Sequence, residues 1–121
     1  MIGDISSSTS IYIVTGQTDM RKSINGLCAI IKDKLGTEIN RHSIYLFCGR
    51  RCDRIKILLK EEDGIVLLYK RLDVKGRYRW PRNQSEVRPL TWRQFDWLMS
   101  GLDIEQPKAI GNPGKQAMIS D

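Results

Sequence analysis

The stretch that decides the fold covers residues 43–81 and reads SIYLFCGRRCDRIKILLKEEDGIVLLYKRLDVKGRYRWP. Strand-forming apolar residues alternate in it with Arg and Lys, and tight-turn signals divide it. Between Arg50 and Arg82 the chain carries 11 Lys or Arg against 5 Asp or Glu, in a protein of 121 residues with net charge +6. This excess of cations in a strand-rich segment predicts a surface that meets an anion, and nucleic acid is the anion that fits best.

Five short runs in the chain are rich in strand-forming residues and predict β-strands: residues 11–14, 44–48, 54–60, 65–71 and 77–80. Asp63-Gly64 is a strong hairpin signal between the third and fourth runs, and Gly49-Arg50-Arg51 predicts a turn between the second and third. Side chains alternate between the two faces of a strand. The third run is therefore expected to place Ile55, Ile57 and Leu59 on a buried face and its cations on the other.

Two helices are predicted beside these strands. The first is expected to begin at Thr18 or Asp19, either of which can cap it, and to end at Gly36. Its apolar residues recur at helical spacing: Met20, Ile24, Leu27, Cys28, Ile31 and Leu35. The second helix begins after Thr91, which can form a capping box with Gln94. Its expected buried residues are Phe95, Leu98, Met99 and Leu102.

These elements predict a single small domain of the α+β class, with a mostly antiparallel sheet of about five strands and two helices. We expect the first helix to pack on the apolar face of the sheet and the second helix to close one edge. The domain is expected to span residues 11–104. Residues 1–10 predict a flexible N-terminal arm, and residues 105–121 predict a disordered tail because they contain Pro, Gly and few large apolar residues.

Composition narrows the class of protein further. The chain has no run of 18 apolar residues, so no transmembrane helix is predicted. Its first ten residues lack the basic and apolar regions of a secretory signal. Three cysteines are an odd number, which indicates reduced thiols rather than a disulfide framework. We therefore expect a cytoplasmic protein that makes no contact with a membrane.

Cations in and near the predicted sheet are the candidates for contact with nucleic-acid phosphates. The set comprises Arg21, Lys22, Arg50, Arg51, Arg54, Lys56, Lys60, Lys70, Arg71, Arg77 and Arg79. Arg54, Lys56 and Lys60 should project together because the side-chain period of a strand is two. Tyr78 and Trp80 are nearby aromatics that can stack on bases. The alternative is a solvated sheet face whose cations oppose edge-to-edge aggregation.

Arg21 and Lys22 fall in the first turn of the first predicted helix. Free backbone N–H groups at a helix N-terminus bind anions, so these residues could complete a phosphate pocket. The alternative is that Asp19 occupies this end of the helix, where an acidic residue is favoured.

Trp97 is a candidate contact for a protein partner. It lies about 200° around the second helix from Phe95, off the buried side, and Arg93 precedes it by one turn. An exposed Trp beside an Arg can anchor a protein interface. The alternatives are that another element covers Trp97 or that Arg93 stacks on its ring.

No catalytic or metal site is predicted. Cys48 and Cys52 supply two of the four ligands that a zinc site needs, and Cys28 is expected on the buried side of a helix. Asp63 and Asp73 bracket one strand, and ten residues at about 3.3 Å each separate them by roughly 30 Å, too far to share a metal ion. We expect no enzyme, no cofactor and no metal.

Three segments carry a family resemblance: GQTDMRKSINGL (residues 16–27), LFCGRRCDRIKILLKEEDGIVLLYKRLDVKGRYRWP (residues 46–81) and LTWRQFDWLMSGLD (residues 90–103). Together they resemble the TnpB accessory proteins, the products of the second open reading frame of IS66-family insertion sequences. The resemblance covers residues 11–107. The family motifs map onto Asp19-Met20-Arg21-Lys22, Gly49-Arg50-Arg51, Lys56, Tyr69-Lys70-Arg71-Leu72 and Arg79-Trp80-Pro81. Cys48 and Cys52 depart from the usual pattern.

The resemblance implies a bacterial cytoplasmic protein that assists transposition, while a separate and larger transposase cuts the DNA. It carries over no catalytic residue. Our first hypothesis is a non-enzymatic accessory protein that binds DNA near the element ends through its basic sheet face. The second is an adaptor that stabilises or recruits the transposase through the second helix and Trp97 without contacting DNA.

Overall fold

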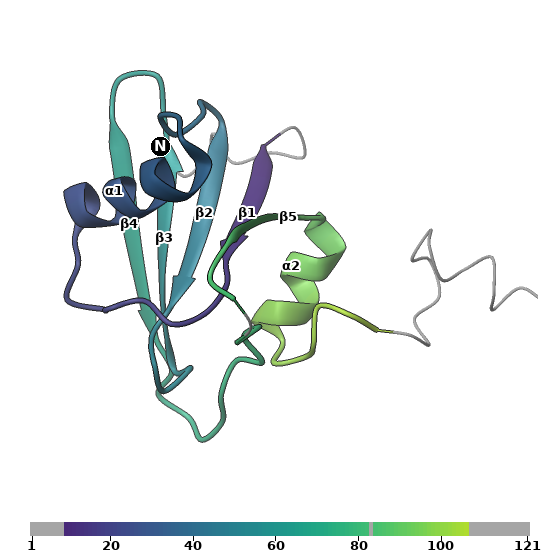
Figure 1. Ribbon diagram of the computed structural model, residues 1–121. Helices are drawn as coiled ribbons and strands as arrows, with labels where there is room; N and C mark the ends of the chain where they lie inside the picture. Colours follow the sequence, from purple (N-terminus) through teal and green to yellow (C-terminus); the bar gives the residue numbers. More distant parts are fainter. Residues whose placement is uncertain (1–8, 83, 107–121) are drawn as a thin grey trace, which may run out of the picture.

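The computed structural model describes residues 9–82 and 84–106. Within these ranges the elements are β1 (Ser10–Val14), α1 (Ile24–Leu35), β2 (Ser43–Cys48), β3 (Arg54–Lys60), β4 (Ile65–Arg71), β5 (Val87–Leu90) and α2 (Trp92–Met99). The five strands form one sheet in the order β4-β3-β2-β1-β5 (Figure 1). The predicted α+β class, with five strands and two helices, is confirmed.

Pairing in this sheet is mostly antiparallel, as predicted. β1 and β2 run parallel, with Ile11 opposite Ile44, because α1 carries the chain back along the sheet between them. β2, β3 and β4 follow as antiparallel neighbours. The β3–β4 hairpin turns at Asp63-Gly64 as expected, and the Glu61 amide donates to the Gly64 carbonyl at 2.9 Å.

α1 begins later than predicted. Its N-cap is Ser23, and the expected caps Thr18 and Asp19 lie in the loop before it. The Thr18 amide donates to the Cys48 carbonyl at the end of β2 (2.8 Å), so the loop is bound to the sheet where a helix was expected. Gly36 ends the helix as predicted, in the left-handed conformation with φ of 74°.

Both faces of the sheet are covered, and every residue of β2 is buried. One face carries Tyr45, Phe47 and Leu58, against which Leu27 and Ile31 of α1 pack. Figure 1 shows α1 lying across this face. The residues that form the core on the second face are Ile11, Ile13, Ile44, Leu46, Cys48, Ile55, Leu59, Tyr78, Trp80, Leu90, Leu98 and Ile104.

The prediction for the position of the first helix is wrong. It was expected on the face of Ile55, Ile57 and Leu59, whereas α1 packs on the opposite face, which Lys56 and Leu58 share. Leu58 accounts for the difference. It is fully buried and interrupts the row of cations on its face, so β3 has an apolar contact to offer on both sides.

The prediction that residues 77–80 form the fifth strand is also wrong. The fifth strand of the sheet is β5, which pairs with β1. The indole N–H of Trp80 donates to the Val14 carbonyl at 2.9 Å, and Trp80 and Tyr78 are 4% and 3% exposed. This segment therefore contributes to the core from outside the sheet. β5 contains Pro89, which weakens a strand prediction but is tolerated on an edge strand, where its missing N–H leaves no ladder bond unmade.

α2 packs against β5, which is an edge strand, in agreement with the prediction that the second helix closes one edge. Its capping box is formed. The Thr91 hydroxyl accepts from the Gln94 amide, and the Gln94 side chain accepts from the Thr91 amide, both at 3.0 Å. Leu98 is buried as expected, but Leu102 lies beyond the helix and is 45% exposed, so its predicted burial is wrong.

Most of the predicted arm and tail lies outside the described residues, which exclude residues 1–8 and 107–121. Within the predicted arm, Thr9 is buried and Ser10 begins β1. Neither α1 nor α2, the helices of the described ranges, has the length and apolar character needed to cross a membrane.

Candidate nucleic-acid interface

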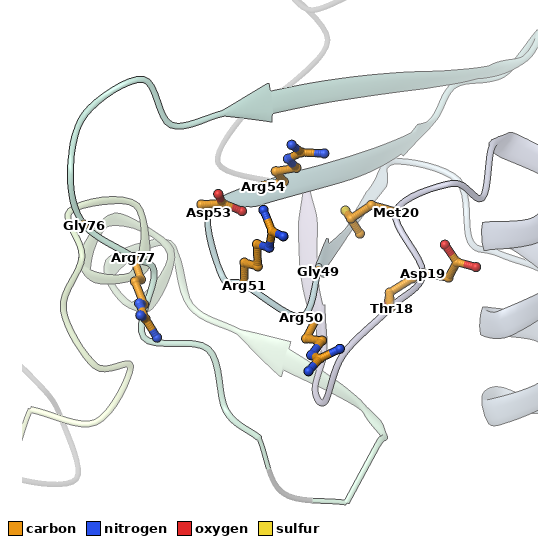
Figure 2. A pocket seen from close by; sticks show the side chains of 10 residues that line it. All are labelled: Thr18, Asp19, Met20, Gly49, Arg50, Arg51, Asp53, Arg54, Gly76 and Arg77. Atoms are coloured by element: carbon orange, nitrogen blue, oxygen red, sulfur yellow. The ribbon is translucent and has the colours of Figure 1, made fainter.

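The loops that follow β1, β2 and β4 meet at one end of the sheet. Parallel neighbours end at the same edge, so the loop 15–23 after β1 lies beside the turn 49–53 after β2. The loop 72–82 after β4 joins them, because the Tyr78 amide donates to the Cys52 carbonyl at 2.8 Å. Together these segments surround a cavity of about 1010 Å³, which Figure 2 shows from close by.

Arginines from three segments line this cavity, which we call the arginine cavity: Arg50 and Arg51 from the turn after β2, Arg54 from the start of β3, and Arg77 from the loop after β4 (Figure 2). Within the described ranges no carboxylate forms an ion pair with any of them. The buried Nε of Arg54 also has no hydrogen-bond partner among these residues. Guanidinium groups without an ion pair form strong hydrogen bonds with anions, so the cavity is suited to an anionic ligand.

Gly49 and Arg82 fix the turn that presents Arg50 and Arg51. A Cβ atom at Gly49 would lie 2.6 Å from Cγ of Met20, so a larger residue would displace that side chain. The Arg82 guanidinium donates to the carbonyls of Gly49 (2.9 Å) and Arg50 (2.7 Å). Arg82 is absent from the predicted site residues, because its role depends on backbone carbonyls that a sequence pattern does not reveal.

Arg21 and Lys22 precede α1 instead of forming its first turn, so the predicted phosphate pocket at the helix N-terminus is not formed there. The Arg21 guanidinium pairs with the Asp19 carboxylate at 2.8 Å. This hydrogen bond lowers the pKa of Asp19 to about 2. Asp19 is therefore negatively charged near neutral pH, and it partly offsets the positive charge of the arginine cavity that it lines.

Arg54, Lys56 and Lys60 lie on one face of β3, as strand alternation predicted, but they do not form one exposed contact surface. Lys56 is only 9% exposed, and its ammonium donates to the Lys22 carbonyl at 2.7 Å. Lys60 lies at the other end of β3, where it lines a separate cavity with Glu61. Of the three cations expected together, only Arg54 reaches the arginine cavity, because α1 and the loop before it cover this face.

The other predicted cations lie outside the arginine cavity. Lys70 faces the second side of the sheet, with its ammonium 6.0 Å from the centroid of the Tyr78 ring. Arg71 is exposed at the end of β4, and Arg79 lines a smaller cavity of about 520 Å³. Tyr78 and Trp80, which we expected to be available for stacking on bases, are buried in the core.

Trp97 is partly exposed and belongs to neither of the two core clusters of the described residues. Arg93, one turn earlier on α2, is exposed. The position of Trp97 agrees with the prediction that it lies off the buried side of the helix.

Within residues 9–82 and 84–106, no group of three or more His, Cys, Asp or Glu side chains is placed to hold a metal ion. Cys48 is fully buried, and burial raises the pKa of its thiol to about 12. The Cys52 sulfur lies 2.6 Å from the Arg82 guanidinium. Asp63 and Asp73 flank opposite ends of β4, as their spacing predicted.

Residues 9–109 match a protein family described as IS66 Orf2 like protein. The chain belongs to this family. The resemblance inferred from the three sequence motifs is thereby confirmed, and it associates this IS66 Orf2-like protein with transposition, since insertion sequences are mobile DNA elements. The matched range contains all the strands and helices of the fold and every arginine of the arginine cavity.

Two curated proteins of Sinorhizobium fredii are similar to this IS66 Orf2-like chain over nearly their full length. The uncharacterized protein y4hO is 30% identical over 105 residues, which cover 87% of this chain and 90% of y4hO. The uncharacterized protein y4jC is 29% identical over 108 residues, which cover 89% of this chain and 91% of y4jC. No solved structure gives a significant match.

Proposed function

We propose that this IS66 Orf2-like protein is a non-enzymatic accessory protein of transposition, which binds DNA through the arginine cavity and assists a separate transposase. It acts in the bacterial cytoplasm, on the DNA of the insertion sequence. The observation that carries the proposal is the gathering of Arg50, Arg51, Arg54 and Arg77 around one open cavity, with no carboxylate of the described residues paired to them.

Arginine is the residue type best suited to this role. Its planar guanidinium stays charged at every physiological pH and presents several donors that match the oxygens of a phosphate. Four such groups at the end of one sheet can contact neighbouring phosphates and release their counterions. Because these contacts engage the backbone of the DNA, they supply affinity and position rather than base recognition.

A salt titration of binding to DNA from the element ends tests the proposal. The affinity of the wild-type protein should fall steeply as salt rises, in proportion to the number of phosphates contacted. Arg50→Ala and Arg77→Ala should each weaken binding to all sequences alike and reduce the slope of log affinity against log salt by about 1. Arg41→Ala is the matched control, since this exposed arginine precedes β2 at the opposite end of the strand.

The titration is run with and without the transposase of the element. Failure of the protein to bind element-end DNA at low salt in both arms would contradict the proposal. Equal effects of Arg41→Ala and Arg50→Ala would also contradict it, because binding would then follow net charge and not the arginine cavity.

A second candidate function is an adaptor that recruits or stabilises the transposase without contacting DNA. Trp97 favours it, because its side chain is partly exposed and lies outside both core clusters of the described residues. An adaptor should co-purify with the transposase, and Trp97→Ala should abolish that association while Arg50→Ala preserves it. The reverse pattern would eliminate this candidate.

A further inference from the structure

An exposed aromatic ring adjoins the arginine cavity. Tyr69 lies on the edge strand β4, directly opposite Lys56, and is 53% exposed. Arg54 pairs with Arg71 two residues further along, so Arg54 and Tyr69 are diagonal neighbours on one face of the sheet. Such neighbours lie about 7–8 Å apart. Tyr69 therefore lies on the same face of the sheet as Arg54, which lines the arginine cavity.

Lys56 holds the Tyr69 ring in place. Its ammonium lies 5.4 Å from the ring centroid, within the range of a cation–π interaction. The same ammonium is fixed by its hydrogen bond of 2.7 Å to the Lys22 carbonyl, and Lys56 is buried. One side of the ring is thus occupied by a fixed cation, while more than half of the residue remains open to solvent. An ordered ring of this kind loses little conformational freedom when it binds.

We propose that this surface binds single-stranded DNA, with Tyr69 stacking on an unpaired base while Arg54 and the other arginines of the cavity hold the adjoining phosphates. The inference rests on the proposed function and deepens it. In a duplex each base is already stacked on its neighbours, and only base edges are accessible in the grooves. A ring on the surface of a sheet can therefore meet the face of a base only in a single strand, where stacking adds to the contacts with phosphate.

The arrangement also fits the charge around the ring. Lys70 points to the opposite face of the sheet, but Arg71 on β4 and Arg54 and Lys56 on β3 share the face of the Tyr69 ring, so a base stacked there lies beside cations that attract its own backbone. An interleaved pattern of an aromatic and cations is typical of surfaces that follow single strands without sequence preference.

Binding of one oligonucleotide in single-stranded and duplex form, at one salt concentration, tests the inference. Tyr69→Thr removes the ring but keeps a strand-forming residue, and it should weaken single-strand binding about 5- to 150-fold while leaving duplex binding within about 2-fold. Tyr69→Phe keeps the stacking surface and should bind single strands like the wild type, and Tyr69→Trp should bind them more tightly. Val74→Thr, at another exposed apolar side chain, is the matched control.

The outcomes separate this inference from the proposed function. Equal losses for single strand and duplex on Tyr69→Thr, or no loss in either, would overturn the stacking role, and the proposed function would stand if Arg50→Ala still weakened both. Absence of binding to either form of DNA would refute the proposed function itself. Thermal unfolding shows whether Tyr69→Thr folds. If it does not fold, single-strand binding by Tyr69→Trp alone tests the inference, and affinity equal to that of the wild type would overturn it. An RNA strand of the same sequence that binds more tightly than the DNA strand would overturn the assignment to DNA.

Discussion

The two ends of the sheet carry opposite charge, although the same strands build both. Where β1 and β2 end, the loops gather the arginines of the arginine cavity. Where β3 turns into β4, the hairpin carries Glu61, Glu62 and Asp63, which line a cavity of about 430 Å³ with His42 and Lys60. The net charge of +6 is therefore distributed unevenly along the strands, with arginines at one end of the sheet and acidic residues at the other.

The length of β3 decides how independent the two ends are. Its seven residues span roughly 23 Å, whereas charges are screened over about 8 Å at physiological salt. Each end therefore acts almost alone on a charged ligand. DNA bound at the arginine cavity should be insensitive to the acidic hairpin, and the predictions below test this separation.

Trp80→Ala should have the largest effect on stability, because Trp80 attaches the loop that carries Arg77 to the core at the end of the sheet where the arginine cavity lies. Trp80 is buried and its indole N–H bonds the Val14 carbonyl, which fixes the loop that carries Arg77. We expect the free energy of unfolding to fall by about 3–5 kcal/mol, as measured by urea denaturation. Trp80→Phe should cost less, since it keeps most of the apolar contact. A loss below about 1 kcal/mol for Trp80→Ala would show that this loop does not depend on the core.

Arg82→Ala should have a smaller effect on stability and a clear effect on binding. Its guanidinium bonds the carbonyls of Gly49 and Arg50, and a net contribution of about 1 kcal/mol for each bond predicts a loss of about 1–2 kcal/mol. DNA affinity should fall as well, because the turn that presents Arg50 loses its support. Arg79→Ala is the control and should stay within about 0.5 kcal/mol. Unchanged stability and affinity for Arg82→Ala would remove this residue from the site.

Local signals predicted the parts of the fold that neighbouring residues determine. The capping box of Thr91 and Gln94, the hairpin at Asp63-Gly64 and the end of α1 at Gly36 each depend on a few adjacent residues, and all three are confirmed. The start of α1 and the identity of β5 depend on contacts between distant segments. The bond from Thr18 to Cys48 and the pairing of β5 with β1 leave no periodic pattern in the sequence.

In the candidate site, too, the features set by neighbouring residues could be predicted from the sequence, and those set by contacts between distant segments could not. A turn rich in arginine could be recognised from the sequence, and Arg50, Arg51, Arg54 and Arg77 do line one cavity. That Lys56 is buried follows from the position of α1, which strand alternation alone placed on the wrong face. The position of Tyr69 beside Arg54 was not predicted for the same reason, because it depends on the register of β3 and β4.

Asp19→Asn should increase the difference in charge between the two ends of the sheet, because it removes a negative charge from the arginine cavity and the ion-pair partner of Arg21. We expect DNA affinity to rise about 2- to 5-fold, the range of an exposed ion pair. Asp33→Asn on α1, outside the cavity, should leave affinity unchanged.

The pKa of Asp19 fixes how this gain depends on pH. Its lowered value of about 2 means that the carboxylate is charged at both pH 5 and pH 8, so the gain should be the same at both. The ion pair stabilises the fold above the ordinary pKa of 3.8, and this contribution is lost as the pH falls towards 2. A gain that disappears at pH 5 would show that another group is responsible.

Glu62→Lys should have the smallest effect, and it tests the separation of the two ends directly. It changes the charge of the acidic hairpin by two units, the same size of change that Arg50→Glu makes at the arginine cavity. At physiological salt we expect Glu62→Lys to alter DNA affinity less than about 2-fold, because the roughly 23 Å between the ends exceeds the screening length of about 8 Å. Arg50→Glu should weaken binding more than tenfold, since it removes a contact and adds repulsion.

At 0.01 M salt, where the screening length is about 30 Å, the gain from Glu62→Lys should become measurable. Comparable effects of the two substitutions at physiological salt would mean that the DNA lies along the whole of β3 and that the two ends act as one surface.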